Sequence, residues 1–176
     1  MLELRQQVPI GDIDTVHVAT YEEAVRRTAT EPEKWNPETR ETADHSIPYL
    51  LAAAWQDGEV TPATFAPARI HDPALRTLIK KLTVTEDSEC TRRYPAESCS
   101  RIEVRTTDGR QLAVETNYPK GHRRNPLTDR EVEGKFRGLG SSALGAHGCD
   151  KLFEEIWNLD KATTLDRLFD SLVISH

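Results

Sequence analysis

The sequence predicts an α+β fold, in which a small sheet with a β-hairpin packs against helices and a helical carboxy-terminal tail follows. Two observations lead to this prediction. Two strand-like segments flank a hairpin turn signal at Asp108-Gly109. The expected order is strand, helices, strands, helices, and strands grouped in a hairpin with the helices set apart favour α+β over a doubly wound sheet.

Four segments have the period and composition of strands. Residues 11–21 alternate through β-branched side chains, and a shorter strand is expected at 82–84. Residues 100–107 and 111–118 are apolar at alternate positions on either side of the turn. We therefore expect the last two segments to pair as the hairpin.

The most apolar stretch of the chain, from Asp44 to Trp55, predicts a buried central helix. Ser46 can cap this helix, and Pro48 falls in the first turn, where a missing amide costs least. Gly58 is a helix stop of the expected type. Because the stretch is apolar nearly all round, we expect it in the centre of the core.

Shorter helices are expected around this central one. Residues 22–27 form one, Thr61 begins a second, and Asp72 followed by proline begins a third. Residues 28–42 and 85–98 are polar and rich in turn-forming residues, so we expect them to be irregular.

The helical tail begins at a capping box made by Thr128 and Glu131. Apolar residues recur at helical spacing over 149–159 and 161–173, which predicts two further helices. Three closely spaced glycines mark a break before them: Gly138, Gly140 and Gly145.

Composition places the chain among folded proteins of ordinary balance. Its 176 residues, 37% hydrophobic and 30% charged, fit one domain over residues 1–176. The net charge of -6 disfavours broad binding to nucleic acid or an anionic membrane. No apolar run is long enough to span a bilayer, and the first residues do not resemble a signal peptide. Three cysteines without a CxxC pair indicate reduced thiols and a cytoplasmic protein.

Motifs for several chemistries are missing from the sequence. The six histidines are scattered without HExxH or zinc-finger spacing, so we expect no metal site. GxSxG and GxxxxGK[ST] are absent too.

One candidate site lies at the amino end of the central helix. Arg40, Asp44, His45 and Tyr49 gather there, and a helix start offers free amides and partial positive charge to a carboxylate. The alternative is structural. Asp44 and His45 would then only cap the helix, and Tyr49 would be an ordinary core tyrosine, which is the commoner arrangement at helix starts.

A second candidate is the basic loop that follows the hairpin. Lys120, His122, Arg123 and Arg124 concentrate positive charge in an acidic protein. Without aromatic residues between the charges, the loop suits an anionic small molecule better than a nucleic acid. A solvated turn or an inter-subunit salt link is the alternative.

These two stretches also carry a family resemblance. The segments that carry it are NPETRETADHSIPYLLAAAWQDGEVTPATF, RIHDPALRTLIKKLTV and TDGRQLAVETNYPKGHRRNPLTDREVEGKF. In order and spacing they resemble the carboxy-terminal region of the MmgE/PrpD family. That family includes 2-methylcitrate dehydratase, cis-aconitate decarboxylase and iminodisuccinate epimerase, and the two stretches lean toward the dehydratase.

The resemblance implies a fold and a chemistry. Family members are cytosolic homodimers whose longer subunits combine a large helical domain with a smaller α+β lid domain. The cleft between them binds a di- or tricarboxylate without metal or organic cofactor. Residues 1–176 resemble the lid and tail alone. The amino-terminal helical domain, with its catalytic aspartate, histidine and lysine, has no counterpart here.

The resemblance also implies site residues. Tyr49 falls on the family's active-site tyrosine, and His45 on a polar position just before it, so both are predicted to be catalytic. Substrate binding is predicted for Arg40, Lys120, His122 and Arg123. In a dehydration, Tyr49 would protonate the leaving hydroxide or hold the substrate hydroxyl, and Lys120 and His122 would clamp a carboxylate.

The expected function is therefore that of a carboxy-terminal domain of a 2-methylcitrate dehydratase-like hydro-lyase. Its expected partners are a small carboxylate and a second copy or a helical-domain subunit. One alternative is a non-catalytic lid or binding module that pairs with a separate helical subunit. Another is a family member with decarboxylase or epimerase chemistry, because a lid does not fix the reaction type.

Overall fold

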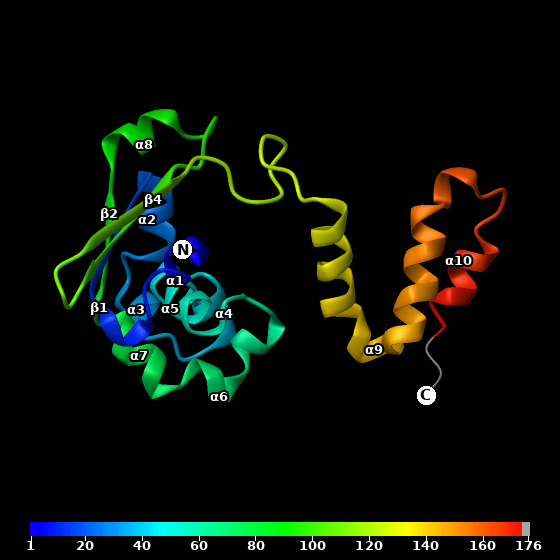
Figure 1. The fold of residues 1–176 in the computed structure, drawn as a ribbon, viewed down its shortest axis with the longest axis horizontal. Helices are drawn as coiled ribbons and strands as arrows, with labels where there is room; N and C mark the ends of the chain where they lie inside the picture. The colour runs from blue at the N-terminus through cyan, green and yellow to red at the C-terminus, as the bar shows by residue number, and fades with distance from the viewer. Residues whose placement is uncertain (174–176) are drawn as a thin grey trace. The chain divides into compact units, whose positions relative to one another are not determined.

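The computed structural model describes residues 1–173, and the chain divides into two compact units (Figure 1). The first unit spans Met1–Pro119, and the second begins at Lys120. Each unit is described by itself. The prediction that residues 1–176 form a single domain stays a prediction.

The first unit is built on a four-stranded mixed sheet in the order β2-β1-β3-β4. β1 (Ile13–Thr20) pairs in parallel with β2 (Leu82–Glu86) and antiparallel with β3 (Ser100–Thr106). β4 (Gln111–Thr116) completes the predicted hairpin with β3. Its turn places Gly109 at a positive φ of 88°, which glycine adopts without strain. The predicted α+β class is confirmed.

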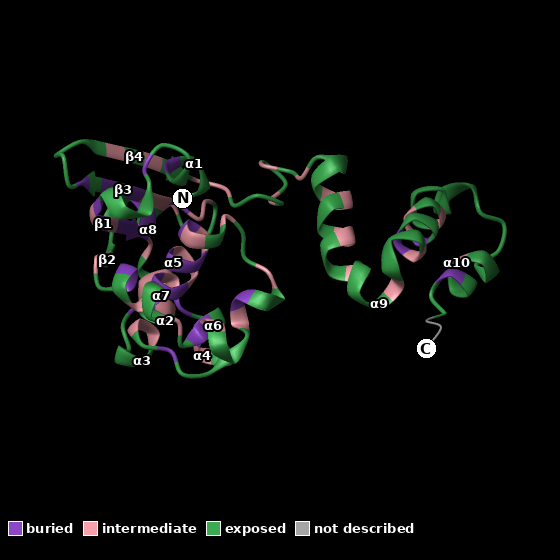
Figure 2. Cartoon of the chain, turned by 60° about the horizontal axis from the view of Figure 1, so that its bottom comes forward, coloured by how far each residue is buried: buried purple, intermediate pink, exposed green. Residues whose placement is uncertain are grey.

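Buried and solvent-accessible residues alternate along the strands, so only one face of the sheet packs against the core. Val16, Ile102 and Val104 are buried and join the core cluster with the central helix. Their neighbours in sequence, such as His17 and Glu103, project from the other face, where His17 is half-buried and Glu103 is exposed. Figure 2 shows buried residues along β1 and β3, whereas β4 has only half-buried and exposed ones. The sheet therefore has one face in the core and one open face.

α5 (Ile47–Asp57) is the central helix that the sequence predicts. The hydroxyl of Ser46 accepts a hydrogen bond from the amide of Tyr49 at 3.0 Å, which caps the helix. Gly58, at φ 84°, ends it in the left-handed conformation. Trp55, Ala52 and Ala53 are buried among the other core residues, so α5 forms the centre of the first unit.

Shorter helices and turns surround α5 and the sheet. They are α1 (Leu2–Arg5), η1 (Ile10–Asp12), α2 (Glu22–Thr28), α3 (Pro32–Trp35), α4 (Arg40–Asp44), η2 (Pro62–Phe65), α6 (Pro67–Ile70), α7 (Pro73–Ile79) and α8 (Ser88–Arg93).

The expectation of irregular chain at 28–42 and 85–98 is wrong, because α3, α4 and α8 lie there. Local capping explains each helix. A proline opens α3, the hydroxyl of Thr39 caps α4, and the carboxylate of Asp87 accepts the first amides of α8. Helices of one to two turns depend on caps more than on an apolar period, so hydrophobic periodicity does not reveal them.

The expectation of reduced thiols is also wrong for two of the three cysteines. Cys90 in α8 and Cys99, just before β3, form a disulfide with a Cα–Cα distance of 5.1 Å. Their separation of nine residues has no recognisable motif, and the turn after α8 brings them together. Cys149, in the second unit, is free and buried.

The second unit consists of helices. α9 (Asp129–Trp157) is interrupted at Gly145, whose φ of 67° and ψ of 173° suit only glycine. The predicted break therefore falls at the last of the three glycines, and the helix continues through the other two. η3 (Leu159–Lys161) and α10 (Asp166–Ser171) follow, so the predicted helix over 161–173 is shorter than expected.

The two halves of α9 fold back on each other. The guanidinium of Arg137 lies 2.5 Å from the carboxylate of Asp150, and the rings of Phe136 and Phe153 are 5.9 Å apart. The predicted capping box opens the helix. There the amide of Thr128 and the Lys120 ammonium hold the pKa of Glu131 at about 2.

Candidate functional site

The first candidate site lies where α4 leads into α5. Arg40 is the first residue of α4, His45 follows its last residue, and Tyr49 is in the first turn of α5. Arg40 and His45 are exposed, whereas Tyr49 is completely buried. Two cationic or potentially cationic side chains therefore stand on the surface beside a buried tyrosine.

The imidazole of His45 is held by its Nδ1 atom. That nitrogen lies 3.0 Å from the carbonyl oxygen of Glu41 and 2.5 Å from Oδ1 of Asp44. Both neighbours are acceptors, so Nδ1 carries the proton and Nε2 is the atom left to act on a ligand. The Glu41 carbonyl, and after it the Asp44 carboxylate, raise the pKa of His45. The raised pKa favours the imidazolium, which can bind a carboxylate or donate a proton.

Tyr49 has the environment of a core residue. Its hydroxyl donates a hydrogen bond of 2.5 Å to the backbone carbonyl of Thr64, which is also buried. Burial raises the pKa of Tyr49. As placed, the hydroxyl has no exposed surface to offer a substrate, and the catalytic role of Tyr49 stays a prediction.

The amino end of α5 differs from the open anion site that the sequence suggests. The hydroxyl of Ser46 already accepts a hydrogen bond from the amide of Tyr49, and the carbonyl of Ser46 accepts one from the amide of Leu50. Pro48 has no amide to donate. The Ser46 hydroxyl also donates to the carbonyl of Lys34. A helix start closed in this way leaves little for a carboxylate.

Ion pairs that sequence reasoning missed lie on the neighbouring helices. Arg69 pairs with Asp57 at 2.6 Å and also with Asp72, which joins α6 to the carboxy end of α5. Arg76 donates to the carbonyl of Pro37 at 2.5 Å. These arginines are engaged within the protein. Arg69 and Asp57 are 12 residues apart and Arg76 and Pro37 are 39 apart, which explains why no local pattern revealed these two contacts.

The basic loop belongs to the second unit and forms a tight turn. The amide of Gly121 donates to the carbonyl of Asn125 at 2.8 Å, and the amide of Arg124 donates to Nδ1 of His122 at 3.1 Å. Lys120 pairs with Glu131 at 3.0 Å, which ties the loop to the start of α9. Arg123 is exposed. The roles of Lys120, His122 and Arg123 in substrate binding stay predictions.

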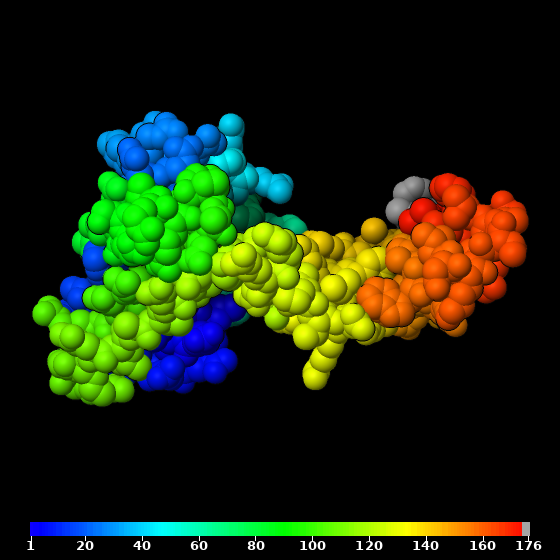
Figure 3. Space-filling view, turned by 90° about the horizontal axis from the view of Figure 1, so that it is seen from above, coloured from blue at the N-terminus to red at the C-terminus, as the bar shows by residue number. Residues whose placement is uncertain are grey.

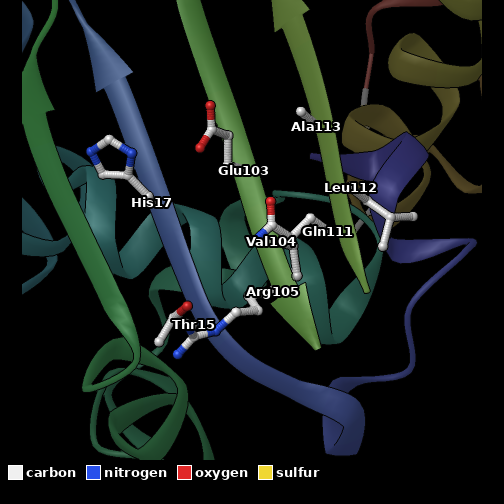
Figure 4. A pocket seen from close by; sticks show the side chains of 8 residues that line it. All are labelled: Thr15, His17, Glu103, Val104, Arg105, Gln111, Leu112 and Ala113. Atoms are coloured by element: carbon white, nitrogen blue, oxygen red, sulfur yellow. The ribbon is translucent and has the colours of Figure 1, made fainter. Parts of the chain in front are cut away.

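The open face of the sheet contains a hollow of about 540 Å³ (Figure 4). His17 on β1 and Glu103 on β3 face each other across the register and project into it. Nε2 of His17 lies 2.8 Å from the hydroxyl of Thr85, and Arg105 pairs with Asp14 at 2.7 Å. The imidazole of His17 and the guanidinium of Arg105 are thus both engaged by neighbouring side chains of the first unit, as is common on a solvated sheet face. We therefore assign the hollow no function.

No helix within residues 1–173 is long and apolar enough to cross a membrane. Over the same residues, no group of three or more histidine, cysteine or acidic side chains could hold a metal ion.

Fold and surface together define a small mixed-sheet α+β unit, with an exposed arginine and histidine beside its central helix and a helical extension after it. The family model for the MmgE/PrpD C-terminal domain matches residues 1–160. The chain therefore belongs to the MmgE/PrpD family, as the sequence motifs predicted.

Characterised relatives include enzymes with two different activities. The chain is 26% identical to cis-aconitate decarboxylase of Mus musculus over 135 residues, covering 75% of this chain and 28% of that protein. It is 31% identical to 2-methylcitrate dehydratase of Cupriavidus necator over 119 residues, covering 65% of this chain and 24% of that protein. The chain thus spans about a quarter of the length of these relatives.

Proposed function

We propose that this chain is the carboxylate-binding lid portion of a lyase that acts on a di- or tricarboxylate, with 2-methylcitrate dehydration as the first candidate reaction. Membership of a family of dehydratases and decarboxylases is the observation that carries the proposal. The short length relative to those enzymes leads us to propose that the reaction needs groups from the rest of a family subunit.

Arg40 and His45 are the proposed substrate contacts. A guanidinium can form two parallel hydrogen bonds to a carboxylate, and such charge-assisted bonds are about twice as strong as neutral ones. The Nε2 atom of His45 would bind a second carboxylate or protonate the leaving hydroxide, because Nδ1 is already engaged by Glu41 and Asp44. The carbon acid next to the carboxylate would lose its proton to a base supplied by the rest of the subunit.

Tyr49 and the basic loop have narrower proposed roles. A proton-donating Tyr49 would first have to release its hydrogen bond to the carbonyl of Thr64. Without that release it is a positioning residue that fixes α5 and, through it, His45. Lys120, His122 and Arg123 would clamp a carboxylate from the second unit.

Two alternatives have specific support. Decarboxylation of cis-aconitate is favoured by the mouse and human relatives, which match longer stretches of this chain than the dehydratase does. A non-catalytic module that pairs with a separate subunit is favoured by the quarter-length match.

A chimeric enzyme tests the site. This chain would replace the matched segment of the Cupriavidus necator dehydratase, and 2-methylcitrate and cis-aconitate would be compared as substrates. We expect His45→Gln to lower kcat/KM by roughly 100-fold or more. Arg40→Gln should lower it by about 10–100-fold, mainly through KM. Matched controls are His17→Gln and Arg110→Gln, which lie on the sheet and its hairpin turn.

The proposal fails if His45→Gln and Arg40→Gln behave as their controls do in a folded, active chimera. Preference for cis-aconitate over 2-methylcitrate would move the assignment to the decarboxylase.

A further inference from the structure

Lys34, on the short helix α3, is a lysine whose side chain is almost buried. Only 12% of that side chain is exposed, although lysine is rarely buried without a paired charge. Its one ion-pair partner among the described residues is Glu31, whose carboxylate lies 4.0 Å from the Lys34 ammonium. That distance is too long for a hydrogen bond, and the Glu31 side chain is itself 62% exposed. The positive charge of Lys34 is therefore only weakly compensated within the first unit.

The ammonium of Lys34 is nevertheless within reach of a ligand. The fully buried side-chain nitrogen and oxygen atoms without a hydrogen-bond partner, within residues 1–173, do not include Nζ of Lys34, so this atom keeps some accessible surface. Lysines often bury the aliphatic stem in this way and keep the charged end at the boundary with water. A cation that is largely desolvated but still reachable attracts an anion more strongly than a fully hydrated one does.

Backbone contacts hold Lys34 beside the first candidate site. The hydroxyl of Ser46, the residue after His45, donates a hydrogen bond to the carbonyl of Lys34. The indole of Trp35 donates to the carbonyl of Ala29 at 2.7 Å, which anchors the end of α3. α3 contacts both α4 and α5, and Figure 3 shows the blue to light-blue surface that α3 and α4 form on the first unit. The backbone of Lys34 is thus fixed next to the segment that carries the proposed substrate contacts.

The charges of Lys34 and His45 act on each other. The Glu41 carbonyl and the Asp44 carboxylate raise the pKa of His45, whereas burial and the positive charge of Lys34 oppose that rise. Two cations that repel each other in the free protein are both stabilised when an anion with several carboxylates binds beside them. The pair is therefore suited to a polyanionic ligand.

We propose that Lys34 binds a carboxylate of the substrate together with Arg40 and His45, and that this third cation adapts the site to a tricarboxylate. The inference rests on the proposed function for the identity of the anion. A dicarboxylate would leave one of the three cations without a partner, and a site built to bind a polar group discriminates against an analogue that lacks the matching group.

The proximity of the two charges can be measured without a ligand. In an NMR titration of the isolated chain, Lys34→Met should raise the pKa of His45, because methionine keeps most of the volume of the stem and removes the charge. Lys80→Met is the matched control, since Lys80 is an exposed lysine of the same unit, and it should leave that pKa unchanged. A His45 pKa that is the same in Lys34→Met as in the unmodified chain would overturn the proposal.

Binding is then measured from the NMR signals of the His45 ring as citrate or malate is added to the isolated chain. Citrate has three carboxylates and malate has two. We expect Lys34→Met to weaken citrate binding about tenfold or more and malate binding by less, and Lys34→Arg to retain most of the affinity for citrate. Equal citrate affinities of Lys34→Met and the unmodified chain would overturn the proposal. An equal loss for both ligands would overturn the preference for a tricarboxylate.

The chimera described above gives a kinetic measurement. Lys34→Met should raise KM for 2-methylcitrate by about 10–100-fold and change kcat by less than about threefold, because a carboxylate contact is made in the ground state and the transition state alike. Lys34→Arg should restore most of the loss, which a role in packing alone does not predict.

The outcomes separate this inference from the proposed function. A chimera that turns over substrate with the same KM in Lys34→Met keeps the proposed function and removes Lys34 from the site. An isolated chain that binds citrate through Lys34, in combination with a folded chimera that has no lyase activity, keeps the tricarboxylate site and removes the proposed function.

Discussion

Removal of the Tyr49 hydroxyl tests how far this residue is part of the core. Tyr49→Phe deletes the donor of a 2.5 Å hydrogen bond and leaves the buried carbonyl of Thr64 without that partner. An unsatisfied buried acceptor costs about 1–3 kcal/mol, partly offset because the phenyl ring is easier to bury than a phenol. We therefore expect the free energy of unfolding of the first unit to fall by about 1–2 kcal/mol.

Urea unfolding followed by tryptophan fluorescence measures this loss. With an m-value of about 2 kcal/mol/M for a unit of this size, the midpoint should fall by roughly 0.5–1 M. Tyr94→Phe is the matched control, because Tyr94 is exposed and keeps its ring stacked on Tyr21 after the change. An unchanged midpoint for Tyr49→Phe, or an equal fall for both variants, would refute the buried hydrogen bond as the main role of the hydroxyl.

Three further predictions concern a titrating group, the disulfide and a backbone position. The raised pKa of His45 stabilises the folded protein, and this stabilisation is fully present below the unfolded-state pKa of about 6.5 and is lost as pH rises through the folded-state pKa. An NMR titration of His45 should show the raised pKa, and Asp44→Asn should lower that pKa. Reduction of the Cys90–Cys99 disulfide should lower the free energy of unfolding by about 2.5 kcal/mol from loop entropy, and Cys90→Ser should remove the effect of dithiothreitol. Gly145→Ala should destabilise the second unit by about 1–3 kcal/mol, whereas Gly134→Ala, within the helix and in open space, should stabilise it slightly in thermal unfolding.

Much of the first unit follows from local signals in the sequence. The hairpin turn at Gly109, the cap at Ser46 and the stop at Gly58 each depend on one or two residues, and the structure confirms them. α3, α4 and α8 have only one to two turns and are fixed by caps, so the apolar period that reveals longer helices is absent from them. The disulfide depends on how the chain turns after α8, which spacing does not encode.

The candidate site was predictable in its residue types but only partly in its geometry. The motif around Arg40, His45 and Tyr49 could be found because the three residues are close in sequence. The sequence left open whether Tyr49 faces a substrate or the core. Tyr49 is buried by contacts from η2, where the backbone carbonyl of Thr64 accepts a hydrogen bond from its hydroxyl.

The most direct test of this account compares three preparations in one assay of 2-methylcitrate and cis-aconitate consumption. They are this chain alone, the remaining part of the Cupriavidus necator dehydratase alone, and the two joined in one polypeptide. The account predicts turnover only in the joined protein. Turnover by the isolated chain, or a folded joined protein that consumes neither substrate, would contradict it.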